Sequence, residues 1–139
     1  MIKTKILVID DDINGTRMVK TILDQTGRYE VAQLNDPNGA LEVAQKFKPD
    51  LILLDICMPG TEGVDVAFRI RSDPELHRVP VVFLTALVSE LEAVGDGTPV
   101  GAFHFIAKPP RLRRLVTAIE SNLEMAHAAE QLSLEGSHL

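Results

Sequence analysis

The sequence predicts an α/β fold: a doubly wound, five-stranded parallel sheet with helices on both faces. Strand-like and helix-like patterns alternate along the 139 residues. Two of the strands, at residues 5–10 and 51–55, are nearly continuous runs of Ile, Val and Leu. Such runs are typical of parallel strands that are buried on both faces.

Each element in the first half of the chain has its own signal. The first strand is followed by an amphipathic helix at about 14–24. Residues 29–34 form a shorter and more polar strand, as expected at the edge of a sheet. Asp36 and Pro37 then begin a second helix, because Asp is favoured at the N-cap and Pro at the first helical position.

The second half continues the alternation. Between its last two strands, residues 89–94 start like a short helix, which the Gly- and Pro-containing stretch 95–99 breaks. The other predicted elements are a strand at 51–55, a helix at about 64–71, strands at 81–84 and about 102–106, and a last helix from about 111 to beyond 129.

Composition limits the class of protein. With 45% hydrophobic and 24% charged residues, the chain fits one globular domain. A formal net charge of −6 argues against a nucleic-acid-binding surface, and no stretch resembles a membrane span or a signal peptide. The single cysteine, Cys57, allows no internal disulfide, so we expect a reducing, cytoplasmic setting.

Acidic residues end two strands that are predicted to be neighbours. Asp10 and Asp11 follow the first strand, and Asp55 ends the third. In an open α/β sheet, ligands bind at the carboxyl ends of the strands, so these carboxylates should share one crevice. Carboxylates this close raise one another's pKa unless a cation neutralises them, and Mg²⁺ suits such a site because it also binds phosphate. The pattern therefore predicts a metal-dependent phosphoryl site.

Four motifs at four predicted strand ends carry a resemblance to a known family. They are ILVIDDD at 6–12, DLILLDICMPG at 50–60, Thr85-Ala86 and Lys108-Pro109. In this order they resemble the receiver domain of bacterial two-component response regulators, of the chemotaxis-regulator type, over about residues 4–125. The resemblance implies the flavodoxin-like strand order 2-1-3-4-5. We expect a receiver (phosphoacceptor) domain at 1–131, and the residues after it, 132–139, are expected to form a frayed C-terminal tail.

The resemblance also implies roles for individual residues. Asp55 would be the phosphoacceptor, and Thr85 and Lys108 would bind the phosphoryl oxygens. Phe105 would turn toward Thr85 after phosphorylation and act as a switch. The implied ligands of Mg²⁺ (or Mn²⁺) are Asp10, Asp11, Asp55 and the backbone carbonyl of Cys57.

Three further residues are expected to shape the backbone around the site. Pro59 and Gly63 belong to the turn after the third strand, and we interpret Gly63 as a turn residue that permits positive φ. The resemblance implies a cis bond between Lys108 and Pro109, which only an X–Pro bond adopts at low cost. Asp12 is better explained as an acid at a helix N-terminus than as a metal ligand.

The same resemblance implies the partners. A sensor histidine kinase or a phosphotransfer protein would donate the phosphoryl group, and a downstream protein would receive the signal. We expect no direct nucleic acid binding by this domain, no membrane contact, and no enzyme activity beyond assistance to its own phosphorylation and dephosphorylation. Because few residues follow the last helix, we expect a stand-alone phosphoacceptor; a receiver that is part of a longer regulator is the alternative.

Two other functions compete with this one. A Mg²⁺-dependent phosphatase with an Asp nucleophile normally needs a second Asp two residues later, where Cys57 stands. A pseudo-receiver would bind partners without phosphorylation, and the complete set of Asp, Thr and Lys residues argues against it. Phe105 also has a simpler interpretation as a residue of the hydrophobic core.

Overall fold

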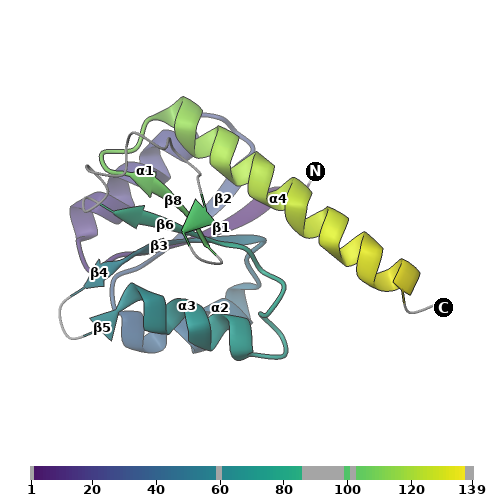
Figure 1. The fold of residues 1–139 in the computed structure, drawn as a ribbon. Coiled ribbons are helices and arrows are strands. Elements are labelled where there is room, and N and C mark those ends of the chain that lie inside the picture. The colour runs from purple at the N-terminus through teal and green to yellow at the C-terminus, as the bar shows by residue number, and fades with distance from the viewer. Residues whose placement is uncertain (1, 59–60, 86–98, 101–102, 137–139) are drawn as a thin grey trace.

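Five parallel strands form the centre of the fold. The computed structural model describes residues 2–58, 61–85, 99–100 and 103–136. The main sheet has the order β2-β1-β3-β6-β8-β7 (Figure 1). Its parallel strands are β1 (Thr4–Ile9), β2 (Tyr29–Leu34), β3 (Leu51–Asp55), β6 (Val81–Thr85) and β8 (Phe103–Ala107). The predicted order 2-1-3-4-5 is confirmed, and the polar strand β2 lies at an edge.

Short antiparallel strands accompany this sheet. β7 (Pro99–Val100) pairs with β8 and adds a sixth strand that was not predicted. β4 (Cys57–Met58) and β5 (Thr61–Glu62) form a separate two-stranded sheet directly after β3. The predicted helix at 89–94 lies outside the described residues.

Helices cover both faces of the sheet, as predicted. α1 (Ile13–Asp24) and α4 (Leu112–Gly136) lie on one face, and α2 (Ala40–Phe47) and α3 (Gly63–Ser72) lie on the other (Figure 1). In β1, Ile6 packs in the core beneath α1 and α4, while Leu7 packs in the core beneath α2 and α3. This alternation explains why the strand is apolar at every position, since both of its faces are buried.

Capping residues set the helix starts. Asp12 is the N-cap of α1, and its side chain accepts a hydrogen bond from the backbone N–H of Asn14. Asp36 is likewise an N-cap and Pro37 occupies a first-turn position, but they begin the 3₁₀ turn η1 (Pro37–Gly39). The α-helix α2 follows it at Ala40, three residues later than Pro37. The predicted start was right as a helical turn and wrong as an α-helix.

The last helix is longer than predicted. α4 continues to Gly136, past residue 132 where a frayed tail was expected. Its final turns are rich in Ala, Glu, Gln and Leu, which favour helix without tertiary support. The domain boundary at residue 131 stays a prediction. Within the described part of the chain, no helix combines the length and apolar composition needed to cross a membrane.

Candidate functional site

The carboxyl edge of the sheet brings the predicted site residues together. Asp55 ends β3, Thr85 ends β6, and Asp10 and Lys108 directly follow β1 and β8. The strands are in parallel register there, with Asp55 opposite Leu84 and Thr85 opposite Ala107. Residues far apart in the sequence therefore converge because parallel strands end at the same edge.

Three carboxylates form the acidic part of the site. Each of Asp10, Asp11 and Asp55 offers one oxygen atom, and these three atoms lie within 4.8 Å of one another. Asp10 and Asp55 are 3% and 7% exposed, whereas Asp11 is exposed. Carboxylate oxygens are hard ligands, and one exposed acid leaves a side open to water and phosphate. This donor set fits Mg²⁺ or Mn²⁺ and does not fit a soft metal.

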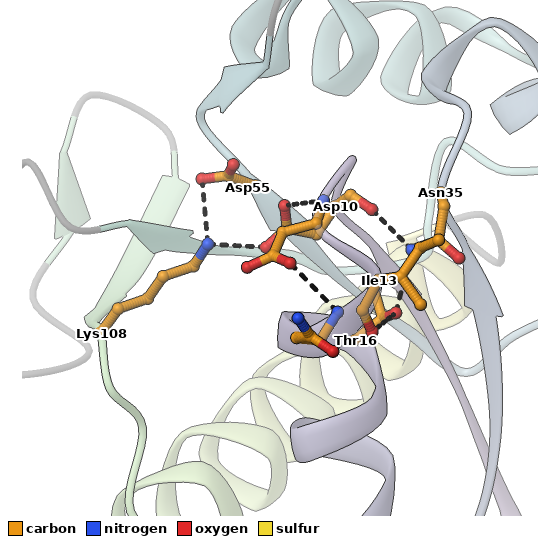
Figure 2. A network of polar contacts seen from close by, with 8 residues as sticks. Asp10, Ile13, Thr16, Asn35, Asp55 and Lys108 are labelled. Carbon is orange, nitrogen blue, oxygen red and sulfur yellow. Dashed lines mark hydrogen bonds and ion pairs between the residues drawn. The ribbon is translucent and has the colours of Figure 1, made fainter.

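Lys108 provides the positive charge between the two buried acids. Its Nζ donates a hydrogen bond of 2.6 Å to Oδ2 of Asp10 and lies 3.6 Å from Oδ1 of Asp55 (Figure 2). Burial lowers the pKa of Lys108, but the hydrogen bond to Asp10 and the charges of Asp10 and Asp55 outweigh it, so the pKa lies above its ordinary value. The ammonium group therefore stays charged at neutral pH.

The backbone of β8 and the following turn aim Lys108 at the acids. The N–H of Lys108 donates to the carbonyl of Thr85 at 3.1 Å, which joins the ends of β6 and β8. The predicted cis bond between Lys108 and Pro109 is confirmed. The side chain of Thr85 is buried at the end of its strand.

Phe105 lies in the hydrophobic core. It is buried and is paired in register with Phe83, on the face of the sheet that α2 and α3 cover. Because side chains alternate along a strand, Thr85 lies on the same face as Phe83. The burial of Phe105 agrees with its interpretation as a core residue, and its ring lies on the same face of the sheet as Thr85. Its role as a switch stays a prediction.

The turn after β3 requires glycine at Gly63 for a reason other than the predicted one. Among the described glycines, only Gly27 has positive φ, so Gly63 does not use the freedom that was expected of it. Instead, a Cβ atom at Gly63 would collide with the carbonyl oxygen of Asp55 and lie 2.7 Å from Cα of Ile56. The N–H of Gly63 donates to the carbonyl of Ile56 at 2.9 Å, which closes this turn tightly.

Two further predicted residues belong to the same turn. Pro59 lies outside the described residues, and Cys57 is described by its backbone in β4. The position of Cys57 two residues after Asp55, at the carboxyl edge, leaves its carbonyl as a proposed ligand.

Asn35 and Thr16, which position the backbone of Asp10, were not predicted from the sequence. The side chain of Asn35 donates to the carbonyl oxygen of Asp10 at 2.8 Å and to Oγ1 of Thr16 at 2.9 Å (Figure 2). One signal was available, since Asn35 directly follows the edge strand and therefore lies at the same edge as the acids. Nothing in the local sequence connects it to Thr16.

Comparison with protein families gives one consistent result. The family model described as response regulator receiver domain matches residues 6–120. The chain is 34% identical over 134 residues to the DNA-binding response regulator MtrA of Mycolicibacterium paratuberculosis, covering 95% of this chain and 57% of that protein. It is 38% identical over 127 residues to the transcriptional regulatory protein CpxR of Klebsiella pneumoniae, covering 91% and 52%. The chain thus spans about half the length of these relatives.

Solved structures share the fold. The chemotaxis protein CheY4 of Vibrio cholerae superposes with a TM-score of 0.73 at 30% identity, over 86% of this chain and 98% of that one. The receiver domain of the sensor histidine kinase PA1611 of Pseudomonas aeruginosa, solved with magnesium in its active-site cleft, gives a TM-score of 0.73. Its identity is 23%, over 88% of this chain and 99% of that one, so this likeness is one of fold.

Proposed function

The chain belongs to the response regulator receiver domain family, and from this premise we propose that it accepts a phosphoryl group on Asp55 in a Mg²⁺-dependent reaction. The observation that carries the proposal is the arrangement at the carboxyl edge of the sheet. There the buried carboxylate of Asp55 shares one site with Asp10, Asp11 and the ammonium group of Lys108.

The proposed transfer forms one bond and breaks one. An oxygen of the Asp55 carboxylate attacks the phosphorus of a phosphohistidine donor and forms an acyl phosphate. The P–N bond breaks, and its electron pair returns to the imidazole nitrogen of the donor. Lys108, which stays protonated, neutralises charge on the phosphoryl oxygens as the group arrives.

The metal ligands in this proposal are Asp10, Asp11, Asp55 and the backbone carbonyl of Cys57. When bound, Mg²⁺ or Mn²⁺ supplies positive charge that offsets the charge of the transferring group. These ligands would hold that charge at the site, and Lys108 holds a further positive charge, 2.6 Å from Oδ2 of Asp10 and 3.6 Å from Oδ1 of Asp55. The chain itself turns over no substrate; it assists its own phosphorylation and dephosphorylation.

We further propose that Thr85 and Phe105 pass the signal on. A phosphoryl oxygen on Asp55 would accept a hydrogen bond from the hydroxyl group of Thr85, whose strand lies next to β3. Movement of Thr85 would open space for the ring of Phe105. Such a change is a shift between two populations, and phosphorylation would favour one of them.

The partners follow from the same proposal. The donor is a sensor histidine kinase or a phosphotransfer protein, and a protein target reads the switched state. The relatives MtrA and CpxR are named as a DNA-binding and a transcriptional regulator, and they are about twice as long as the matched region. We propose that any such output is provided outside the residues of this receiver domain.

Intact-mass measurement tests the proposal. The protein is incubated with Mg²⁺ and a small acyl-phosphate donor, and the wild type is compared with Asp55→Asn and with Asp65→Asn, an exposed aspartate of α3. We expect one phosphoryl adduct in the wild type and in Asp65→Asn, none in Asp55→Asn, and none with a chelator. An adduct that persists in Asp55→Asn would contradict the assignment.

The competing functions predict other results in the same experiment. A pseudo-receiver would give no adduct under any of these conditions. A phosphatase with an Asp nucleophile would release inorganic phosphate over many turnovers, without a stable adduct. Measuring phosphate release beside the mass therefore separates the three functions.

A further inference from the structure

A buried polar network lies behind Asp10, on the side away from Lys108. Its centre is the hydroxyl group of Thr16, a residue of α1 that is 0% exposed. Oγ1 of Thr16 donates to the carbonyl of Ile13 at 3.1 Å and accepts from Asn35 and Gln33, both at 2.9 Å. One hydrogen atom and two lone pairs complete the capacity of a hydroxyl group, so every position on this oxygen is used.

Asn35 connects this hydroxyl group to Asp10. Its Nδ2 donates one hydrogen to Thr16 and the other to the carbonyl oxygen of Asp10, at 2.8 Å (Figure 2). A carbonyl oxygen can only accept, which fixes the orientation of the amide group. The preceding residue, Leu34, accepts from the N–H of Asp10 at 3.1 Å. Two consecutive residues at the end of β2 therefore hold both backbone polar groups of Asp10.

The carbonyl group that Asn35 holds belongs to the peptide bond between Asp10 and Asp11. Because a peptide unit is planar, holding this oxygen restrains the positions of both Cα atoms, from which the two side chains extend. The side chain of Asp10 is restrained further, since its Oδ1 accepts from the N–H of Asp12 and its Oδ2 from Lys108. The side chain of Asp11 is exposed, and the hydrogen bond from Asn35 restrains the peptide bond that carries it.

We propose that Asn35 and Thr16 are positioning residues for the Asp10–Asp11 carboxylate pair, and that they set its affinity for Mg²⁺. This inference rests on the proposed function of the site. Partners of metal ligands commonly contribute about 10-fold to 100-fold to metal affinity, because a ligand that is held in place pays less entropy on binding. A purely structural role is the alternative, since the same hydroxyl group also joins α1 to β2 through Ile13 and Gln33.

Three substitutions separate the two roles. Asn35→Ala removes the contact to Asp10 and leaves Thr16 bonded to Ile13 and Gln33. Thr16→Val removes the hydroxyl group at nearly constant volume, and Thr16→Ser retains it. The matched control is Thr26→Val, which removes a hydroxyl group that donates to the carbonyl of Leu23 at 2.8 Å, three residues earlier, beyond the other end of α1.

The measurement is the dissociation constant of Mg²⁺, determined by isothermal titration calorimetry on the metal-free protein. We expect it to rise about 10-fold in Asn35→Ala and Thr16→Val, and to stay within about twofold of the wild type in Thr16→Ser and Thr26→Val. With a small acyl-phosphate donor, the Mg²⁺ concentration for half-maximal adduct formation should rise by the same factor. The rate at saturating Mg²⁺ should return to that of the wild type.

Urea unfolding identifies variants that are folded under these conditions. If Asn35→Ala is folded and binds Mg²⁺ as the wild type does, the inference is overturned, whatever the stability of Thr16→Val. An equal loss in Thr26→Val would also overturn it, because the loss would then follow stability and not the network. Failure of the proposed function looks different: the wild type itself would bind no Mg²⁺ or form no adduct on Asp55.

Discussion

At the carboxyl edge of the sheet, Asp10 and Asp55 both face Lys108, whereas at the amino edge Tyr29 and His104 each face a residue of α4. Tyr29, the first residue of β2, donates from its hydroxyl group to Glu120 at 3.0 Å. Nδ1 of His104, the second residue of β8, lies 2.7 Å from Oδ1 of Asn122.

The two edges of the sheet carry two kinds of polar group, hydrogen-bonded pairs with α4 at the amino edge and a cluster of charged groups at the carboxyl edge. At the amino edge, each pair joins one strand residue to one residue of α4 and so connects this helix to the sheet. At the carboxyl edge the buried acids Asp10 and Asp55 both contact Lys108, and the exposed acid Asp11 lies beside them. Burial of charged groups costs more free energy than burial of neutral hydrogen-bonded pairs, so the carboxyl edge depends on the contacts that Lys108 makes with the two acids.

The largest loss of stability is expected for Gly63→Ala, which tests the close packing of the turn after β3 at the carboxyl edge. In Gly63→Ala the new Cβ would collide with the backbone of Asp55 and Ile56, which cannot move as a flexible side chain does. We expect the free energy of unfolding to fall by about 3 kcal/mol, measured by urea denaturation. Gly39→Ala is the control, since its Cβ would meet no heavy atom within 4 Å. Equal losses in both variants would contradict the assignment.

A pH titration tests the amino edge. Burial, followed by the hydrogen bond and charge of Glu120, raises the pKa of Tyr29 to about 12 from an ordinary 10.0. The folded state therefore holds this proton more firmly, so the stabilisation is complete below pH 10 and is lost as pH rises toward 12. Two pKa units correspond to roughly 2–3 kcal/mol. Unfolding measured between pH 9 and pH 12 should show this loss in the wild type.

Tyr29→Phe provides the control for that titration. Without the hydroxyl group, the steep part of the loss between about pH 10 and 12 should disappear, while contributions from lysines remain. An unchanged pH profile in Tyr29→Phe would show that other groups dominate at the alkaline end.

Replacement of Lys108 tests how much its positive charge stabilises the carboxyl edge. Lys108→Met removes the ammonium group that contacts Asp10 and Asp55, and in metal-free buffer we expect a loss of about 1.5 kcal/mol in unfolding free energy. Saturating Mg²⁺ should reduce the loss, because the metal supplies the missing charge. Lys20→Met, which removes an exposed pair with Asp24 on α1, should cost at most about 0.5 kcal/mol and show no such dependence. A Mg²⁺-independent loss in Lys108→Met would contradict this account.

The smallest effect belongs to the second pair of the amino edge. Asn122→Ala removes the partner of His104 and a 2.7 Å hydrogen bond to the carbonyl of Ala118. We expect a loss of about 1 kcal/mol, typical of a neutral hydrogen bond, and no change in the yield of the phosphoryl adduct. The neighbouring exposed Ser121→Ala serves as control. A change in adduct yield would mean that the two edges are coupled.

The local patterns of the sequence predicted most of the architecture. Continuous aliphatic runs located β1, β3 and β6, because strands buried on both faces need apolar residues at every position. Asp12 and Asp36, predicted near the N-terminal ends of helices, each accept a capping hydrogen bond in the structure. Where local signals were weak, the result was less exact: η1 replaced the first turn of the second helix, and β7 was missed because two residues carry no periodicity.

The fold class and the acidic site could be predicted from the residues themselves, whereas the strand order and the roles of Lys108 and Thr85 were predicted from the resemblance. The fold class and the acidic site follow from periodicity and from the acids at strand ends, which are local properties of the chain. The contacts that position these site residues became visible in the folded structure alone. The role of Asn35 depends on Thr16, nineteen residues away along the chain, and Gly63 is required by the close approach of the Asp55 backbone. Such contacts depend on packing between elements, and no local pattern records the distance between two atoms that meet only after folding.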